Sequence, residues 1–557
     1  MTFSDIYIVK DGLSIAGEYI NLKYIFILLF IIALIYISFK GLLKADKKYS
    51  FKVKFVYRII PIVIILITLF SYINSLKSEG KLKLQPINIK LSYTENGFLY
   101  SYFNSYTQFL KSKPNNYTQE NILEIKSKLE KEEYKDNFNI KPNIIFLQLE
   151  AVMDLSNMKD LCLTGDPLTN FNKLSQEYTS GILNVPTFGG GTVRTEFEIL
   201  TGYSNDYLSP GEIAYTTILK QKKVDSIASY LNNYGYEGTM IHNYRGNFYD
   251  RDTVAKNLGF KRFIPLEYMY NTEDHPNYPK DFLLLANIRK VLAENNNPKF
   301  IYGIGVQTHG PYNSSYSNTN NTIKVTGEMS DEARKEAQDY VDRLVEVDTF
   351  LGNLVKYLEE LNEPVVLVVF SDHLTTLKEV TEKYINDDNK FKTRYFIYDN
   401  IGLPKSDEEI EAYELSGKVF DLLGINGNKI NQINKLYKNN KDYYTIAELA
   451  QYDLLYGKKY LLDRESKFYN QEYTMGIEEI SINKVIINEN YVEVKGKFFN
   501  QFSVIYADGK KLDTEYINSG TLRFNGNFKN VKSIKVKQLG MYGKVLGETD
   551  SYILNEN

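Results

Sequence analysis

The 557-residue chain lacks tryptophan altogether and contains one cysteine, Cys162, and four histidines. A single cysteine excludes an intrachain disulfide, so any domain outside the cell must be stabilised by its hydrophobic core alone. The chain also lacks an excess of positive charge, since its formal net charge is −3. Without a broad basic surface for a phosphate backbone, nucleic acid is not an expected partner.

Two long apolar runs lie near the N-terminus, at residues 24–43 and 56–76, and each approaches the roughly 20 residues that cross a bilayer. We therefore expect a membrane anchor over residues 1–77 with two transmembrane helices. The alternative, a buried hairpin of a soluble domain, is disfavoured because both runs are long and uniformly apolar. The basic residues in and between the runs are Lys40, Lys44, Lys47, Lys48, Lys52, Lys54 and Arg58.

This basic cluster fixes the expected topology. Because basic loops stay in the cytoplasm, the chain after residue 76 is predicted to lie outside the cell. An extracellular domain without disulfides suits a multi-pass cell-membrane protein of a Gram-positive bacterium.

The rest of the chain divides into three patterns. Residues 78–140 are highly charged, with helical spacing over 118–134, and predict a connector. Residues 141–472 alternate short apolar runs with amphipathic helices, which predicts an α/β domain whose mostly parallel sheet is covered by helices on both faces. Residues 473–557 contain short alternating segments separated by Gly, Asn and Asp, and predict a small β-sandwich without catalytic groups. The predicted strands of the α/β domain are 143–149, 238–241, 299–306, 364–370 and 394–398, and its predicted helices include 224–234, 282–295 and 330–361.

Chemically reactive side chains follow two of these strands. Glu150 comes directly after strand 143–149, and Asp372 and His373 follow strand 364–370. In α/β sheets, ligands bind beyond the carboxyl ends of the strands, and carboxylates with imidazole suit a divalent cation. Either group taken alone is equally consistent with a helix cap.

A glycine-rich segment, residues 186–198 (PTFGGGTVRTEFE), places three glycines before Thr192. Glycines allow a reacting group to approach the backbone closely. Thr195 and Glu198 have the spacing of a capping box, so Thr192 is expected just before a helix N-terminus, where the helix dipole favours an anion. The alternative is a glycine-rich turn in which Thr192 has no function.

Three of the four histidines also follow predicted strands: His242, His309 and His373. A single histidine is more often structural than functional, but three at equivalent strand ends predict one shared pocket. His275 is expected to be a loop residue.

With these residues the chain resembles the lipoteichoic acid synthases, phosphoglycerol transferases of the alkaline phosphatase and sulfatase superfamily. The resemblance extends from about residue 143 to residue 453. It rests on five ordered motifs: Gln148-Leu149-Glu150, GTVRTEF from Gly191, HNYRGNFYDRD over residues 242–252, HGPY from His309, and Ser371-Asp372-His373. Two departures are Tyr249, where the synthases have Trp, and Gly191, where they often have Lys. The synthases also usually carry five transmembrane helices, whereas two are visible here.

The resemblance implies a role for each matching residue. Glu150, Thr192, Asp372 and His373 would bind a divalent cation, Mn²⁺ in the first instance and Mg²⁺ or Zn²⁺ as alternatives. Thr192 would be the nucleophile, activated because coordination lowers the pKa of its hydroxyl. The residues implied to hold the phosphoglycerol group are His242, Tyr249, Arg251 and His309, with His309 or His242 carrying the proton.

The implied reaction moves a phosphoglycerol group from a lipid such as phosphatidylglycerol to a teichoic-acid-like polymer of the cell wall, through a phosphothreonine. Arg251 would neutralise phosphoryl charge, or would instead form a salt bridge with Asp250 or Asp252.

Other functions remain alternatives. A sulfatase needs a Cys/Ser-x-Pro-x-Arg motif, but Cys162 is followed by Leu163-Thr164-Gly165, so sulfate ester hydrolysis is not expected. A two-zinc phosphodiesterase would need more histidines. A phosphoethanolamine transferase shares the threonine nucleophile and the membrane anchor, although its relatives rely on more histidines and on disulfides. An inactive cell-wall binding scaffold is disfavoured because Glu150, Thr192, Asp372 and His373 are all present.

Overall fold

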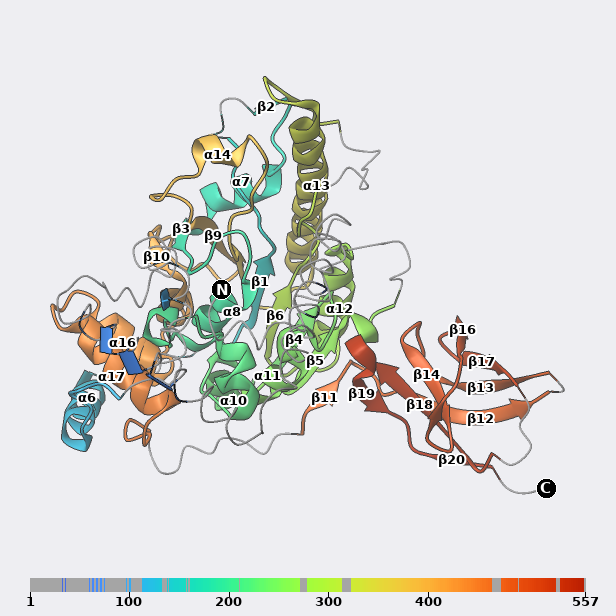
Figure 1. Cartoon of the computed structure of the whole chain (residues 1–557). Coiled ribbons are helices and arrows are strands. Elements are labelled where there is room, and N and C mark those ends of the chain that lie inside the picture. Colours follow the sequence, from blue (N-terminus) through green and yellow to red (C-terminus); the bar gives the residue numbers. More distant parts are fainter. Residues whose placement is uncertain are drawn as a thin grey trace, which may run out of the picture. The chain divides into compact units, whose positions relative to one another are not determined.

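The computed structural model describes residues 113–132, 138, 140–156, 158, 161–209, 211–270, 278–312, 322–462, 472–488, 490–526 and 531–554, with isolated positions before residue 113 (Figure 1). The two predicted spans, 24–43 and 56–76, lie almost wholly outside these residues. None of the helices in the described part of the chain has the length and apolarity needed to cross a membrane. Residues Lys113–Tyr207 and Ile213–Asn557 form one compact unit.

A nine-stranded sheet forms the centre of this unit, in the order β10-β3-β9-β8-β1-β6-β4-β5-β11. All of its pairings are parallel except the two that β9 makes with β3 and β8. The predicted mostly parallel α/β sheet is therefore confirmed. The strands are β1 (Asn143–Leu149), β3 (Thr179–Asn184), β4 (Glu237–His242), β5 (Arg262–Pro265), β6 (Lys299–Ile304), β8 (Val365–Ser371), β9 (Lys392–Asp399), β10 (Ile410–Glu411) and β11 (Thr474–Met475).

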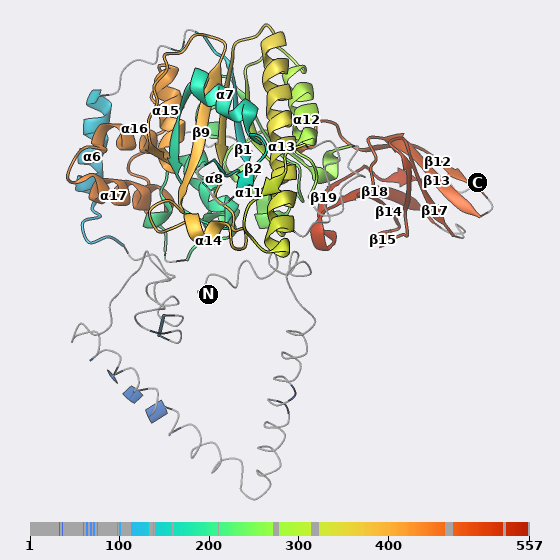
Figure 2. The same cartoon turned by 90° about the horizontal axis from the view of Figure 1, so that it is seen from above.

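Helices cover both faces of the sheet, which is why β1 and β8 are buried along their whole length. On one face, alternate β1 side chains pack with α7 (Thr169–Glu177), α12 (Phe282–Leu292) and α13 (Asp331–Glu360) in a single hydrophobic cluster. Helices α12 and α13 lie side by side (Figure 2). On the other face, Gln148 bonds to α8 (Thr192–Thr201), and Gly238 packs on α10 (Ile227–Asn232).

The predicted elements of the α/β domain are present. Each of the five predicted strands corresponds to β1, β4, β6, β8 or β9, and α10, α12 and α13 correspond to the three predicted helices. Helix α13 begins where Ser330 accepts a hydrogen bond from the Ala333 amide, followed by two acidic residues that favour the helix N-terminus. The charged segment contains α6 (Gln119–Glu132). The domain boundaries themselves stay predictions.

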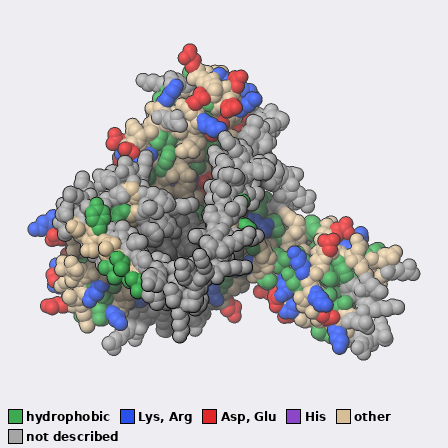
Figure 3. Space-filling model, in the orientation of Figure 1, with side chains coloured by type: hydrophobic (Ala, Val, Ile, Leu, Met, Phe, Trp, Pro, Cys, Tyr) green, Lys and Arg blue, Asp and Glu red, His purple; other side chains and the backbone are tan. Residues whose placement is uncertain are grey.

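Two antiparallel sheets make up the C-terminal β module, defined here as residues 481–554. The first contains β12 (Ser481–Ile487), β13 (Tyr491–Lys497), β17 (Thr521–Asn525) and β16 (Glu515–Asn518). The second contains β15 (Lys510–Lys511), β14 (Ser503–Ala507), β18 (Ser533–Leu539), β19 (Val545–Glu548) and β20 (Tyr552–Ile553). Side chains of both sheets share one hydrophobic core, whose buried members include Val492, Val494, Leu522, Phe524, Ile505, Ile534 and Val536. On the face of the module seen in Figure 3, charges of both signs are mixed.

The shared core of the β module predicts a specific stability change. Leu522 is fully buried, so Leu522→Ala should lower the free energy of unfolding of the module by about 2–5 kcal/mol through lost burial and a cavity. Ile553→Ala, at a side chain that is 62% exposed, should change it by less than about 0.5 kcal/mol. Urea denaturation measures both. Equal effects would contradict a core between the two sheets.

Candidate active site

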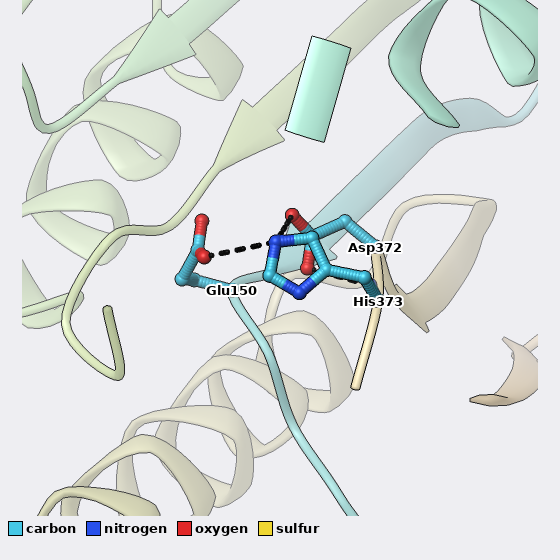
Figure 4. Close-up of side chains that lie close together, drawn as sticks. All are labelled: Glu150, Asp372 and His373. Atoms are coloured by element: carbon cyan, nitrogen blue, oxygen red, sulfur yellow. Dashed lines mark hydrogen bonds and ion pairs between the residues drawn. The ribbon is translucent and has the colours of Figure 1, made fainter. Parts of the chain in front are cut away.

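Glu150, Asp372 and His373 lie together at the carboxyl end of the central sheet (Figure 4). Strands β1 and β8 are parallel neighbours, with Leu149 paired to Ser371, so the next residue of each strand, Glu150 or Asp372, emerges at the same edge. Nε2 of His373 lies 3.4 Å from Oε1 of Glu150 and 3.3 Å from Oδ2 of Asp372. The register of the two strands therefore places Glu150 beside Asp372.

The three side chains have the donor set and geometry of a divalent-cation site. One atom of each lies within 4.8 Å of the others, and all three side chains are buried. Oδ1 of Asp372 accepts hydrogen bonds from the amides of Ala151 and His373, and Nδ1 of His373 faces the Leu374 carbonyl at 3.1 Å. The other atoms, Asp372 Oδ2 and His373 Nε2, are buried and have no hydrogen-bond partner among the described residues. Buried unpaired polar atoms are costly, and a cation would satisfy both.

The cluster contains two buried carboxyl groups, those of Glu150 and Asp372. Burial, and after it the neighbouring Asp372 carboxylate, raise the pKa of Glu150 to about 8. Two carboxylates removed from water and close together favour either a proton or a cation between them.

Thr192 lies beside this cluster as the first residue of α8. Its hydroxyl donates a hydrogen bond to Oε2 of Glu150, at 3.4 Å. The preceding Gly191 has φ +85°, a left-handed conformation that favours glycine, and a Cβ there would lie 2.9 Å from the Thr187 hydroxyl. The glycine run therefore turns the chain so that the Thr192 hydroxyl meets the cluster.

The capping box predicted from Thr195 and Glu198 is wrong. The Thr195 hydroxyl instead donates to the Asp372 carbonyl at 2.7 Å, and Glu198 accepts from the Asn205 amide at 2.8 Å. The helix start has no side-chain cap bond among the described residues. Tertiary contacts thus use both side chains, and Thr195 ties α8 to the strand end that carries Asp372.

Arg251 pairs with neither Asp250 nor Asp252. Arg251 as a whole is 1% exposed, and its guanidinium forms a two-pronged ion pair with Glu196 of α8, with Nε 3.1 Å from Oε2. Asp250 and Asp252 instead pair with Lys220 and Lys544. The alternative of a salt bridge between Arg251 and Asp250 or Asp252 is therefore wrong.

Glu196 also belongs to a buried chain of hydrogen bonds. Gln148 donates to Glu196 at 3.3 Å, and the Tyr302 hydroxyl donates to Gln148 at 2.8 Å. Sequence reasoning assigned no role to Glu196, although it lies in the motif that contains Thr192. The network orients a fixed positive charge, which lowers the pKa of Glu150 and so acts within the same site.

Tyr249 and His242 lie near Arg251. The Tyr249 ring is 5.6 Å from the Arg251 guanidinium. His242 ends β4, is buried, and places Nδ1 3.1 Å from the Ile304 carbonyl. Burial, with the charge of Arg251, lowers the pKa of His242 well below its usual value, so this imidazole is neutral at physiological pH.

His309 follows β6 and is partly exposed, with its ring 4.6 Å from the Tyr278 ring. Its loop is joined to the His242 loop through Asp281, a residue that sequence reasoning missed. One oxygen of Asp281 accepts from Asn243 at 2.9 Å and from the Val306 amide at 3.0 Å. The structure thereby connects the two histidine loops, whereas His275 lies outside the described residues.

Comparisons with known proteins agree with this architecture. The sulfatase family model matches residues 142–425. A putative cyclic beta-1,2-glucan modification protein of Rhizobium meliloti is 32% identical over 240 residues, which are 43% of this chain and 37% of that protein. The chain thus spans less than half the length of the curated relatives it matches.

Solved structures are also similar to this chain, and the first one named here shares its fold. The Streptococcus pyogenes phosphoglycerol transferase GacH in complex with sn-glycerol-1-phosphate has a TM-score of 0.57 and 23% identity, and the match covers 65% of this chain and 99% of that chain. The lipoteichoic acid synthase LtaP from Listeria monocytogenes has a TM-score of 0.45 and 18% identity, over 56% of this chain and 81% of that chain.

The raised pKa of Glu150 predicts pH-dependent metal binding. Below about pH 8 the metal-free Glu150 is protonated, and a cation must displace that proton. Mn²⁺ affinity should therefore rise about tenfold per pH unit from pH 6 to 8 and level off above pH 8, as measured by titration calorimetry. Glu150→Gln should weaken binding at least about 100-fold and flatten the pH dependence.

Glu198 supplies a matched control for this measurement. It is also a buried carboxyl with a pKa raised to about 8 by burial, but it lies outside the three-residue cluster. Glu198→Gln should leave Mn²⁺ affinity and its pH dependence unchanged. Loss of Mn²⁺ binding in this control, with retention in Glu150→Gln, would contradict the assignment.

Proposed function

The chain belongs to the sulfatase family, and from this premise we propose that it transfers a phosphoglycerol group from a phospholipid to a cell-envelope polymer through a phosphothreonine at Thr192. One observation carries the proposal: the Thr192 hydroxyl is hydrogen-bonded to Glu150 at the edge of the Glu150–Asp372–His373 cluster. A hydroxyl beside a cation site at a helix start is a suitable nucleophile for phosphoryl transfer.

A divalent cation held by Glu150, Asp372, His373 and Thr192, for which we propose Mn²⁺ with Mg²⁺ or Zn²⁺ as alternatives, would lower the pKa of the hydroxyl and neutralise phosphoryl charge. Asp372 Oδ2 and His373 Nε2, both buried without a hydrogen bond among the described residues, support this donor set. They also argue against an inactive scaffold, because buried polar atoms without hydrogen bonds destabilise a fold that does not use them.

In the first step, Thr192 Oγ attacks the donor phosphorus, and the bond from phosphorus to the diacylglycerol oxygen breaks. The proton of Thr192 passes to that oxygen, with the partly exposed His309 as carrier. Arg251, held by Glu196, offers its remaining N–H groups to the phosphoryl oxygens. Phosphoglycerol is then esterified to Thr192.

In the second step, a hydroxyl of the acceptor attacks the same phosphorus and the bond to Thr192 Oγ breaks. His309 takes the acceptor proton and returns it to Thr192, so the enzyme is restored. The neutral, buried His242 orients the group by hydrogen bonding, and Tyr249 lies beside Arg251 at the phosphate position.

Donor, acceptor and location are part of the proposal. Similarity to a phosphoglycerol transferase solved with sn-glycerol-1-phosphate supports phosphatidylglycerol as donor. Similarity to a putative glucan modification protein supports a glycan or teichoic-acid-like polymer as acceptor. The basic residues between the two apolar runs support a membrane anchor with the catalytic domain outside the cell.

The donor can be tested directly. Full-length protein in detergent with Mn²⁺ should release fluorescent diacylglycerol from labelled phosphatidylglycerol, and omission of Mn²⁺ with added chelator should abolish release. Release only from phosphatidylethanolamine would identify a phosphoethanolamine transferase instead.

Thr192→Ala should lower turnover by several orders of magnitude, because it removes the atom that forms the covalent intermediate. Its fold and most of its Mn²⁺ affinity should persist, since two carboxylates and an imidazole remain. Thr192→Ser retains a hydroxyl and should keep measurable activity. Mass spectrometry of protein incubated with donor alone should locate a phosphoglycerol adduct on Thr192, and an adduct on Thr195 or Thr187 would refute the assignment.

Arg251→Lys should raise KM for the donor at least about tenfold, because an ammonium cannot bind Glu196 in two-pronged geometry and still face a phosphate. The matched control is Arg289→Lys on the exposed face of α12, which should leave KM unchanged. Steady-state kinetics with labelled phosphatidylglycerol measure both variants. An unchanged KM in Arg251→Lys would remove Arg251 from the substrate site.

A further inference from the structure

The segment between β4 and α11 (Arg251–Asn257), residues 243–250, is held in a strained conformation. Tyr249 and Asp250 are consecutive non-glycine residues with φ +55°. Left-handed backbone is unfavourable for such residues, and it persists only where surrounding contacts hold it. This segment ends directly before Arg251, so its conformation determines where the guanidinium lies.

The β module contacts this segment at its centre. The Asn247 side chain donates to the Met541 carbonyl at 3.2 Å and accepts from the Met541 amide at 2.8 Å. The approach is close: a Cβ on Gly540 would lie 2.6 Å from Oδ1 of Asn247. The turn between β18 and β19 therefore packs against Asn247 so closely that a Cβ at residue 540 would overlap with it.

Two further contacts fix the flanks of the segment. Nζ of Lys544 lies 2.6 Å from Oδ2 of Asp252, one residue beyond Arg251. On the other side, a Cβ on Gly246 would lie 3.3 Å from Leu546 of β19. The residues of the β module that make these contacts belong to the turn after β18 and to β19.

The base of the contact is buried around Glu267. Its carboxylate accepts from the Gly246 amide at 2.9 Å and pairs with Arg245 at 3.1 Å. Its backbone carbonyl accepts from Asn500 at 2.6 Å and from the Gln538 side chain. Both amides belong to the β module, so the module and residues 245–246 are bound to the same buried residue.

We propose that the β module positions the substrate arginine: its contacts through Gly540, Met541 and Lys544 hold residues 243–252 in the strained conformation that places Arg251 against Glu196. The inference rests on the proposed function, in which Arg251 binds the donor phosphodiester. The proposed cation ligands directly follow β1 and β8 or begin α8, and none belongs to residues 243–252. Loss of the contact should therefore weaken substrate binding and leave metal binding intact.

Gly540→Ala tests this most sharply. Gly540 has φ −81° and ψ −166°, which alanine adopts readily, so the added methyl acts through its overlap with Asn247. We expect amide hydrogen exchange in residues 243–252 to accelerate about tenfold or more, KM for labelled phosphatidylglycerol to rise about tenfold, and kcat and Mn²⁺ affinity to change less than about twofold. Gly520→Ala is the control, because its Cβ would meet the nearest atoms at 3.5 Å.

A second pair of variants covers the case in which Gly540→Ala fails to fold. Lys544→Ala removes the contact with Asp252, and Lys511→Ala removes an exposed lysine elsewhere on the module. Faster exchange of residues 243–252 in Lys544→Ala but not in Lys511→Ala supports the inference. Unchanged exchange in both Lys544→Ala and a folded Gly540→Ala overturns the inference. A loss of Mn²⁺ affinity as large as the rise in KM, in either variant, also overturns it. If the wild-type chain cleaves no phosphatidylglycerol, the proposed function fails, while the exchange measurement still decides the role of the module.

Discussion

The parallel pairing of β1 with β8 is the constraint on which the rest of the site depends. With Leu149 opposite Ser371, the two strands deliver Glu150 and Asp372 to one buried place, and His373 follows immediately. Two buried carboxylates repel each other and lose hydration, which explains the raised pKa of Glu150 and favours a cation. The fold thus creates an unfavourable charge arrangement that its proposed cofactor would resolve.

Two side chains beside this cluster are held in place by buried contacts, Arg251 and Thr195. Arg251 lies close enough to lower the pKa of Glu150 and of His242, yet its guanidinium is fixed by Glu196. A buried ion pair of this kind contributes little net stability, so its main effect here is to orient the Arg251 guanidinium. Thr195 also has an orienting role, because its hydroxyl donates to the Asp372 carbonyl and so joins α8 to the end of β8.

The sequence predicts the centre of the domain well and its periphery poorly. Strands β1 and β8 are continuous apolar runs, so their ends and the residues Glu150 and Asp372 could be located directly. Strand β3 was missed because Thr179–Asn184 has no such run, and its place depends on a close approach in which Gly181 meets the Glu408 carbonyl. Thr195 was assigned to a helix cap because its tertiary partner is 177 residues away. The role of Glu196 could not be predicted, since a glutamate near a helix start usually faces solvent.

Anomalous diffraction at the manganese edge, from crystals of the protein grown with Mn²⁺, tests the central claim most directly. The account predicts one anomalous peak with Glu150, Asp372, His373 and the Thr192 hydroxyl at about 2.0–2.3 Å. A peak elsewhere, or a peak at this position with the Thr192 hydroxyl turned away from it, would contradict a cation-activated threonine nucleophile.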